Sequence, residues 1–306
     1  MQSLFLPAIA LMNRLRYTQK FAFMGILMLV AVGVVLNNLY SALDSNIRSS
    51  SAELRGIKTI KPAQQIVQYM QQHRGMSAGV IAGNEAMKEK RVGKEKDVSA
   101  AIKAAETKMS PDLLASKEWK AIVDGWAQIG ADGLNWTSTE NFTRHTALID
   151  KIITFMVDVA DDTSLTVDPD IDSYYLIDTV LNKAPVVLER LGQMRAKGTG
   201  VLTKKQMYDQ QKIEMSSLMA ELNSAQKILR INLEKTARFN PGMKAALDSA
   251  AKEFSESAER INALVVDDML LGTFATTPKD YFELTTVAID KGTRRCTTSC
   301  CRRSIS

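Results

Sequence analysis

Cysteine, glycine and proline are scarce in this 306-residue chain. Its three cysteines, Cys296, Cys300 and Cys301, all lie in the last 11 residues, so the body has no disulfide scaffold. Sixteen glycines, seven prolines and 6% aromatic residues provide few turns and few residues that favour strands. Alanine, leucine, methionine, lysine and glutamate are common, and all of them favour helices. The composition therefore predicts an all-α fold.

Patterns of catalytic and metal-binding residues are also missing. His73 and His145 are the only histidines, too few for a histidine cluster, and the three cysteines lack the partner ligands of a zinc site. Residues 168–172 begin like a calcium-binding loop, but the loop lacks its glycine and its final glutamate. No phosphate-binding loop, dinucleotide-binding fingerprint or catalytic triad pattern occurs. We therefore predict no enzymatic activity, no cofactor and no metal.

The net charge of +5 is concentrated at the two ends of the chain. Residues 1–20 contain Arg14, Arg16 and Lys20 without an acidic residue, and residues 291–306 contain five basic residues without an acidic one. The body between them therefore has a slight excess of acidic residues. A nucleic-acid-binding domain would have a basic body, so nucleic acid is not a predicted partner.

One long apolar run is present, and no second one follows it. Phe21–Leu36 comprises 16 consecutive apolar or glycine residues. A helix over residues 21–40 would span about 30 Å, the thickness of the apolar core of a bilayer. The later apolar stretches contain Asp158 or the pair Asp267-Asp268, and they are too short and too charged to cross. We predict a single transmembrane helix at residues 21–40.

Basic residues on the N-terminal side of this run predict its orientation. Lysine and arginine stay in the cytoplasm, so residues 1–20 should be cytoplasmic and residues 41–290 should lie outside. Two alternatives are a cleaved signal peptide and a buried helix of a soluble protein. The run is longer than the apolar region of a usual signal peptide, and Asn37-Asn38-Leu39-Tyr40 after it is a poor cleavage site.

The rest of the chain carries helix-start signals at wide spacing, separated by stretches of 20–40 residues that lack strand-like alternation. These signals are Pro62, Ser110-Pro111, Asp170, Thr203 with Gln206, Asn240-Pro241 and Thr277-Pro278. Apolar residues step by three or four along the predicted helices, as in Met215, Leu218, Leu222, Ala225, Leu229 and Leu233. The pattern predicts an elongated antiparallel bundle with four-helix packing, repeated once along its long axis and ending near Asp290.

Two arginines occupy positions where a bundle helix normally places leucine or isoleucine. The first is on the stripe Val67, Met70, Arg74, Ser77 and Ile81. The second is on the stripe Leu181, Ala184, Leu188, Leu191, Arg195, Gly198 and Leu202. Both arginines also occur in the same short pattern, Q-x-R-x4-G-V, and this coincidence indicates an internal repeat.

An inward-facing guanidinium is costly unless it is paired. Glu189 precedes Arg195 by six residues, and the acid nearest to Arg74 is Glu85. Neither arginine therefore has a carboxylate one turn away, and glycines beside each of them leave space for a small anion, which a planar guanidinium binds bidentately. The candidate anion site comprises Arg74, Arg195 and Ser77. The alternative is that each arginine reaches the surface or pairs with a distant glutamate.

Several segments resemble a known family. Pro7–Arg16, just before the apolar run, is similar to the start of many bacterial methyl-accepting chemotaxis proteins. Gln72–Gly79 (QHRGMSAG) resembles the signature of their nitrate- and nitrite-sensing type of periplasmic domain. Asp168–Asp178 and Leu188–Arg195 resemble later segments of such receptors. The resemblance covers about residues 1–291.

This resemblance implies two coaxial four-helix bundles in a homodimer, with a ligand site near the dimer axis lined by Arg74 and Arg195. The implied partner is a small anion such as nitrate, nitrite or a carboxylate. The implied location is the bacterial inner membrane, with residues 41–290 in the periplasm. His73 departs from the family, which commonly has glutamate before Arg-Gly, so the identity of the ligand is left open. Chemotaxis coupling proteins would bind only a full-length form.

The end of the chain differs from that of a complete receptor. Residues 291–306 form a basic, cysteine-containing tail instead of a second span, a HAMP linker and a cytoplasmic signalling hairpin. We interpret this tail as the result of truncation or a frameshift, and the alternative is a basic surface patch with its own role. The leading hypothesis is the ligand-sensing module of a chemoreceptor. The alternatives are the sensor half of a membrane histidine kinase or cyclase, and a ligand-free, membrane-anchored structural bundle.

Overall fold

The computed structural model describes residue 13 and residues 16–167 and 171–303. These residues form helices and loops without a strand, which confirms the predicted all-α fold. The α-helices are α2 (Tyr17–Ile81), α3 (Lys88–Glu106), α4 (Pro111–Ala115), α5 (Lys117–Asp132), α6 (Ser138–Asp162), α7 (Ile171–Asp178), α8 (Ala184–Lys204), α9 (Asp209–Phe239), α10 (Lys244–Leu264) and α11 (Pro278–Arg303). Short 3₁₀ turns are η2 (Glu85–Met87), η3 (Gly133–Asn135), η4 (Leu165–Val167) and η6 (Pro241–Met243), and π-helical segments are η5 (Thr179–Lys183) and η7 (Val265–Leu270).

The chain divides into two compact units, residues 1–51 and 52–306. The first unit contains the apolar part of α2, the one helix among the described residues that is long and apolar enough to cross a membrane. None of this apolar stretch is buried, whereas the core helix of a soluble protein would be. A signal peptide satisfies the same conditions of length and composition, so the membrane anchor stays a prediction.

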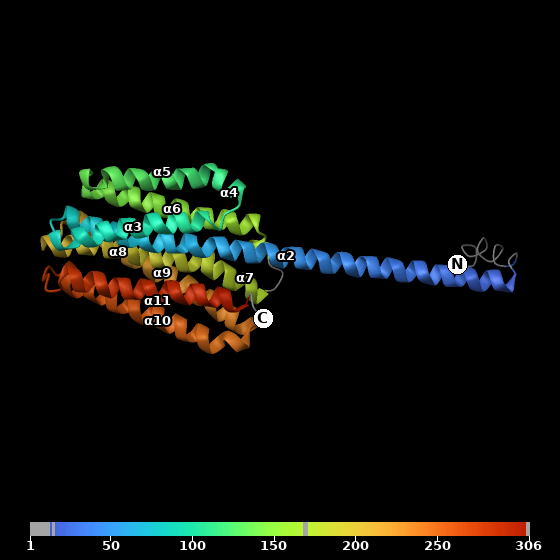
Figure 1. Cartoon of the computed structure of the whole chain (residues 1–306). Helices are drawn as coiled ribbons and strands as arrows, with labels where there is room; N and C mark the ends of the chain where they lie inside the picture. Colours follow the sequence, from blue (N-terminus) through green and yellow to red (C-terminus); the bar gives the residue numbers. More distant parts are fainter. Residues whose placement is uncertain (1–12, 14–15, 168–170, 304–306) are drawn as a thin grey trace. The chain divides into compact units, whose positions relative to one another are not determined.

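The second unit contains two helical bundles, each with its own hydrophobic core (Figure 1). The first combines the second half of α2 with α3, α5 and α6, and its core includes Trp119, Ile122 and Ile149. The second combines α8, α9, α10 and α11, and the leucines of the predicted α9 stripe are buried in it. Burial of one leucine stabilises a fold by about 1.5–3 kcal/mol, so this stripe explains why α9 packs against α8 and α10.

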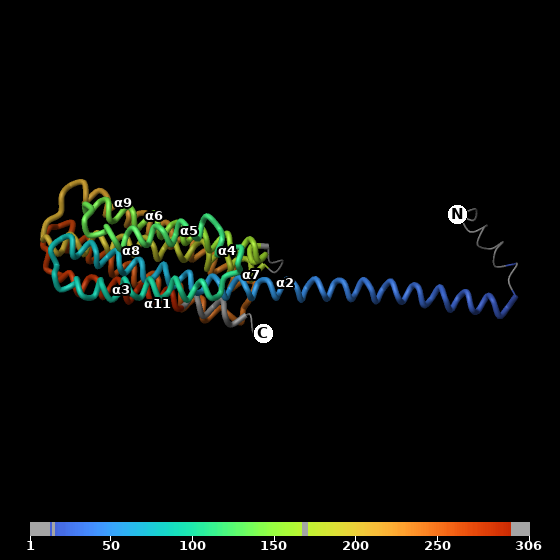
Figure 2. The backbone as a smooth tube through the Cα atoms, turned by 45° about the horizontal axis from the view of Figure 1, so that its top comes forward, coloured from blue at the N-terminus to red at the C-terminus, as the bar shows by residue number. Residues whose placement is uncertain are grey.

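The two bundles lie side by side. Gln68 and Gln71 of α2, in the first bundle, hydrogen-bond Asp290 of α11 and Glu189 of α8, in the second. Figures 1 and 2 agree that the helices of both bundles run along the same length. This arrangement differs from the expected coaxial repeat. The bundles are joined along their flanks, by polar and small residues. The periodicity within each helix carries no information about such contacts.

Two predicted helix starts are confirmed by hydroxyl groups that cap the first turn. The Ser110 hydroxyl caps α4, which begins at Pro111, and the Thr277 hydroxyl caps α11, which begins at Pro278. Asn240 precedes the short turn η6 and makes no side-chain cap. A short polar residue followed by proline therefore marks the start of a helix when a loop precedes the pair.

Three other expectations are wrong. Pro62 lies inside α2, since the residues before it are also helical, and proline there removes one backbone hydrogen bond without ending the helix. Thr203 and Gln206 do not start a helix: Thr203 is still part of α8, and the next helix begins at Asp209. The last helix, α11, continues past the expected end near Asp290.

Some expectations fall outside the described residues. They are the cap at Asp170, the calcium-like start at residues 168–170 and most of the Pro7–Arg16 segment. For residues 295–303 the structure describes the helix without the side chains, so the cysteines of the tail are not placed.

Candidate functional site

Arg74 of α2 and Arg195 of α8 are both fully buried, with 0% of their surface exposed. They are the largest fully buried side chains of the described residues. The other members of both predicted stripes are also buried, apart from Ile81, which is partly exposed. The inward orientation predicted for both arginines is confirmed, and the alternative that they extend to the surface is wrong.

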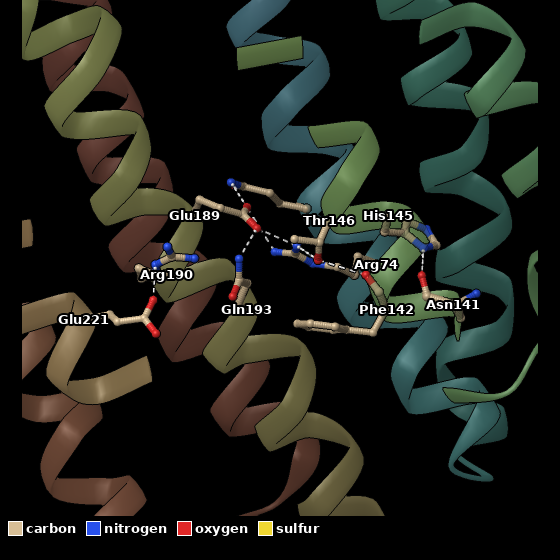
Figure 3. Close-up of polar contacts among 10 residues, drawn as sticks. Arg74, Asn141, Phe142, His145, Thr146, Glu189, Arg190, Gln193 and Glu221 are labelled. Carbon is tan, nitrogen blue, oxygen red and sulfur yellow. Dashed lines mark hydrogen bonds and ion pairs between the residues drawn. The ribbon is translucent and has the colours of Figure 1, made fainter. Parts of the chain in front are cut away.

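Arg74 has a counter-ion, Glu189 of α8 (Figure 3). Its Nη1 donates to Oε1 of Glu189 at 2.6 Å and its Nη2 donates to Oε2 at 3.1 Å, which makes the pair bidentate. Nη1 also donates to Thr146 Oγ1 at 2.8 Å, and the guanidinium lies 5.3 Å from the centre of the Phe142 ring. The alternative that an arginine pairs with a distant glutamate is therefore confirmed for Arg74, whose partner comes from a different helix.

The carboxylate of Glu189 is held in place by further contacts. It accepts hydrogen bonds from Gln71 Nε2 and Gln193 Nε2, each at 2.8 Å, in addition to those from Arg74. These contacts satisfy both carboxylate oxygens in a buried position, so Glu189 is fixed on Arg74. The next residue, Arg190, turns away and pairs with Glu221 of α9 at 2.8 Å (Figure 3).

Arg195 has the same kind of surroundings without the carboxylate. Its Nη1 donates to Thr286 Oγ1 at 2.8 Å, and the guanidinium lies 4.9 Å from the centre of the Phe282 ring. Its Nε and Nη2 are buried and have no hydrogen-bond partner among the residues that the structure describes. Both atoms lie on one edge of the guanidinium, and such an edge binds planar oxyanions bidentately.

The charge of Arg195 is poorly compensated. Burial, followed by the neighbouring charge of Arg74, lowers the pKa of Arg195 to about 9, although Asp290 and Glu189 raise it. Arg195 is therefore a cation at neutral pH. A buried charge left without a partner costs roughly 3–5 kcal/mol, so this position favours the binding of an anion.

The residues that contact the two arginines are themselves repeated. The pattern F-x3-T-x3-D occurs at residues 142–150 of α6 and again at residues 282–290 of α11. In each copy the phenylalanine lies next to an arginine and the threonine accepts a hydrogen bond from it. These residues were not predicted from the sequence. The F-x3-T-x3-D pattern, which is repeated along with Q-x-R-x4-G-V, is the signal that identifies them.

The third candidate residue, Ser77, is buried in the first bundle. Its hydroxyl accepts a hydrogen bond from Arg91 Nε of α3 at 3.0 Å, and Arg91 also pairs with Glu95 at 3.0 Å. The structure thus brings Arg74 and Arg195 close together, with Gly75 next to the Nε of Arg195. Ser77 instead forms a hydrogen bond with Arg91.

The two histidines, which no sequence pattern connects, are in contact. His73 Nδ1 and His145 Nε2 are 2.9 Å apart, and both side chains are buried. His145 Nδ1 lies 2.8 Å from the carbonyl oxygen of Asn141, which can only accept. His145 therefore carries its proton on Nδ1, and its Nε2 accepts from His73. Burial lowers the pKa of both histidines, so the pair is neutral at pH 7.

A cavity of about 380 Å³ lies between α2, η2, α3 and α11, next to residues that contact Arg195. Phe282 and Thr286, which both contact Arg195, form part of its wall. Lys90, Lys279 and Glu283 also line it, which leaves an excess of positive charge. This cavity is therefore a candidate route by which an anion reaches Arg195.

Comparison with known proteins assigns most of the chain to one family. Residues 65–293 match the family model described as nitrate and nitrite sensing, and the match includes both buried arginines. No curated protein and no solved structure matches the chain. Because the family model spans more than half of the 306 residues, the chain belongs to the nitrate- and nitrite-sensing family.

Proposed function

We propose that this chain is the ligand-binding part of a bacterial chemoreceptor and that nitrate or nitrite binds to Arg195. The observation that carries the proposal is the Nε–Nη2 edge of Arg195, which is buried, charged at neutral pH and unpaired among the described residues. Nitrate is small, planar and singly charged, and two of its oxygens match such an edge. The family, a sensory module of signalling proteins, supports the same class of ligand.

Arg74 shapes the proposed site without binding the ligand itself, since Glu189 neutralises its charge. The next residue, Gly75, faces Arg195. A Cβ at this position would be 3.4 Å from Arg195 Nε and 2.8 Å from the Phe282 ring. Glycine therefore keeps the free edge of Arg195 accessible, and a ligand there would touch α2, α8 and α11.

Such a ligand would act on the packing of α2 against α11. It would bind Arg195, which is packed against Gly75 of α2 and against the Phe282 and Thr286 side chains of α11. A ligand that binds one arrangement of these helices more tightly than another shifts the equilibrium between them. Because α2 is continuous from Tyr17 to Ile81, a displacement at the site would be passed along the helix that contains the apolar segment.

The proposal includes a membrane anchor at residues 21–40. The basic residues at 14–20 favour a cytoplasmic N-terminus, so residues 41–290 would lie in the periplasm, outside the bacterial inner membrane. The receptor would be a homodimer, and chemotaxis coupling proteins would bind the cytoplasmic region of a full-length form.

Replacing Arg195 with methionine is expected to weaken nitrate binding by at least about 100-fold, because two hydrogen bonds from a charged group, each contributing about 1.5–3 kcal/mol, are lost. Isothermal titration calorimetry of the whole chain in lipid nanodiscs, with nitrate and nitrite as titrants, measures this change. Arg190→Met is the matched control, because Arg190 lies on the same helix but pairs with Glu221 near the surface. This variant should bind nitrate like the wild type. Nitrate binding that survives Arg195→Met, or a wild-type chain that binds neither anion, would refute the proposal.

A further inference from the structure

Two equivalent guanidinium groups lie in this protein, and one of them is already occupied by a carboxylate. Arg74 and Arg195 each contact a threonine and a phenylalanine of the repeated F-x3-T-x3-D pattern. Glu189 forms a bidentate pair with Arg74. Arg195 has no carboxylate partner among the described residues, and its Nε and Nη2 are unpaired. Glu189 thus supplies one arginine with the oxyanion that a ligand would supply to the other, through Nη1 and Nη2 of Arg74 instead of Nε and Nη2.

The internal repeat shows which residue would supply the missing carboxylate. Glu189 of α8 precedes Arg195 by six residues, and the residue six positions before Arg74 of α2 is Gln68. In the internal repeat α2 corresponds to α8, so residue 68 corresponds to Glu189 and Arg74 corresponds to Arg195. The contact between Glu189 and Arg74 therefore corresponds to a contact between residue 68 and Arg195. An acid at position 68 would neutralise Arg195, but glutamine is uncharged.

Two aspartates agree with this correspondence. Gln68 Nε2 donates to Oδ1 of Asp290, the last residue of the pattern on α11, at 2.6 Å. Asp150 is the matching residue on α6, and it lies close enough to Glu189 that the glutamate, after the larger effect of burial, raises the pKa of Asp150. Asp290 therefore neighbours Gln68, which precedes Arg74 by six residues. Asp150 neighbours Glu189, which precedes Arg195 by six residues.

We infer that Glu189 is a built-in anion at the first of two repeat-related arginine sites and that Gln68 keeps the second open, so that each chain accepts one singly charged anion. This inference rests on the proposed function in one respect, namely that the ligand binds to Arg195. Arg74, Glu189 and Arg195 together leave one buried positive charge, and partly buried Asp290 at the edge reduces it further. A doubly charged anion such as sulfate would leave buried charge uncompensated, so the site rejects it.

The main test is Glu189→Ala, which removes the carboxylate and vacates its place on Arg74. Nitrate titration of the whole chain in nanodiscs should give one bound anion per wild-type chain and two per Glu189→Ala chain, with sulfate binding at least about 10-fold tighter in the variant. The double variant Arg74→Gln with Glu189→Ala removes both charges of the pair. It should return to one nitrate per chain and reject sulfate like the wild type.

The outcomes separate this inference from the proposed function. If the wild type binds one nitrate and Glu189→Ala still binds one, with unchanged rejection of sulfate, the role of Glu189 is wrong and the site at Arg195 stands. If the wild type binds no nitrate but Glu189→Ala binds one, Glu189 is a built-in anion and the proposed function fails. If neither protein binds nitrate, both ideas are overturned.

A second variant tests the inference if Glu189→Ala does not fold. Gln68→Glu places a carboxylate at the position that corresponds to Glu189, and it should abolish nitrate binding at Arg195. Gln68→Leu removes the hydrogen bond to Asp290 without adding charge, so it should retain nitrate binding. Undiminished nitrate binding by Gln68→Glu would overturn the inference.

Discussion

Replacing Arg74 with methionine should lower the free energy of unfolding by about 3–5 kcal/mol, because it leaves the buried carboxylate of Glu189 without its counter-ion. Glu189 would retain only its hydrogen bonds from Gln71 and Gln193, and these neutral donors cannot balance its charge. Chemical denaturation of the whole chain in nanodiscs, in nitrate-free buffer, followed by circular dichroism, measures the change.

Arg195→Met is the matched control, and its expected effect has the opposite sign. This substitution removes a buried cation that has no carboxylate partner among the described residues, and methionine fills a similar volume. The ligand-free protein should therefore be unchanged or more stable by about 1–4 kcal/mol. Equal destabilisation by both substitutions would mean that Arg195 is a structural ion-pair partner like Arg74, and it would remove the basis for an anion site.

Stability should also fall as the pH drops from about 7.5 to 5.5, because of the buried pair His73 and His145. Burial is the main cause of the lowered pKa of both histidines, and for His145 the neighbouring His73 adds to it. In the unfolded chain each histidine takes up a proton near its ordinary pKa of about 6.5, whereas in the folded pair protonation requires a lower pH. The unfolded state therefore gains protons first, and stability decreases by up to about 1.4 kcal/mol per pH unit for each histidine.

Denaturation curves at several pH values test this dependence. The pKa of Glu95, next to His73, is lowered from its ordinary value, so its loss of charge affects stability only at more acidic pH. The variant His145→Asn removes one of the two titrating groups and should reduce the slope by about half. A stability that does not change between pH 7.5 and 5.5 would show that the histidines are protonated equally in both states.

The sequence was sufficient to predict the all-α fold and the burial of both arginines. These features depend on spacing within one helix: Arg74 and Arg195 lie on stripes of residues that step by three or four, and such stripes face the core. Helix starts at Pro111 and Pro278 were predictable for the same reason, because a cap and the proline after it are neighbours in the chain.

Contacts between helices were not predictable in this way. Glu189 is six residues from Arg195 but pairs with Arg74, which is far away in the sequence, so spacing pointed to an arginine without a partner. The histidine pair and the flank-to-flank arrangement of the bundles also depend on contacts between separate helices. Only the internal repeat carries information across helices, and the F-x3-T-x3-D pattern on α6 and α11 is the part that would have located the surroundings of both arginines.

A crystal structure of the chain with nitrate would show which arginine binds the anion. We expect one planar anion per chain, with two oxygens at about 2.7–3.1 Å from Nε and Nη2 of Arg195, while Glu189 stays on Arg74. Nitrate bound at another position, or in place of Glu189 on Arg74, with the edge of Arg195 left unliganded, would contradict this expectation.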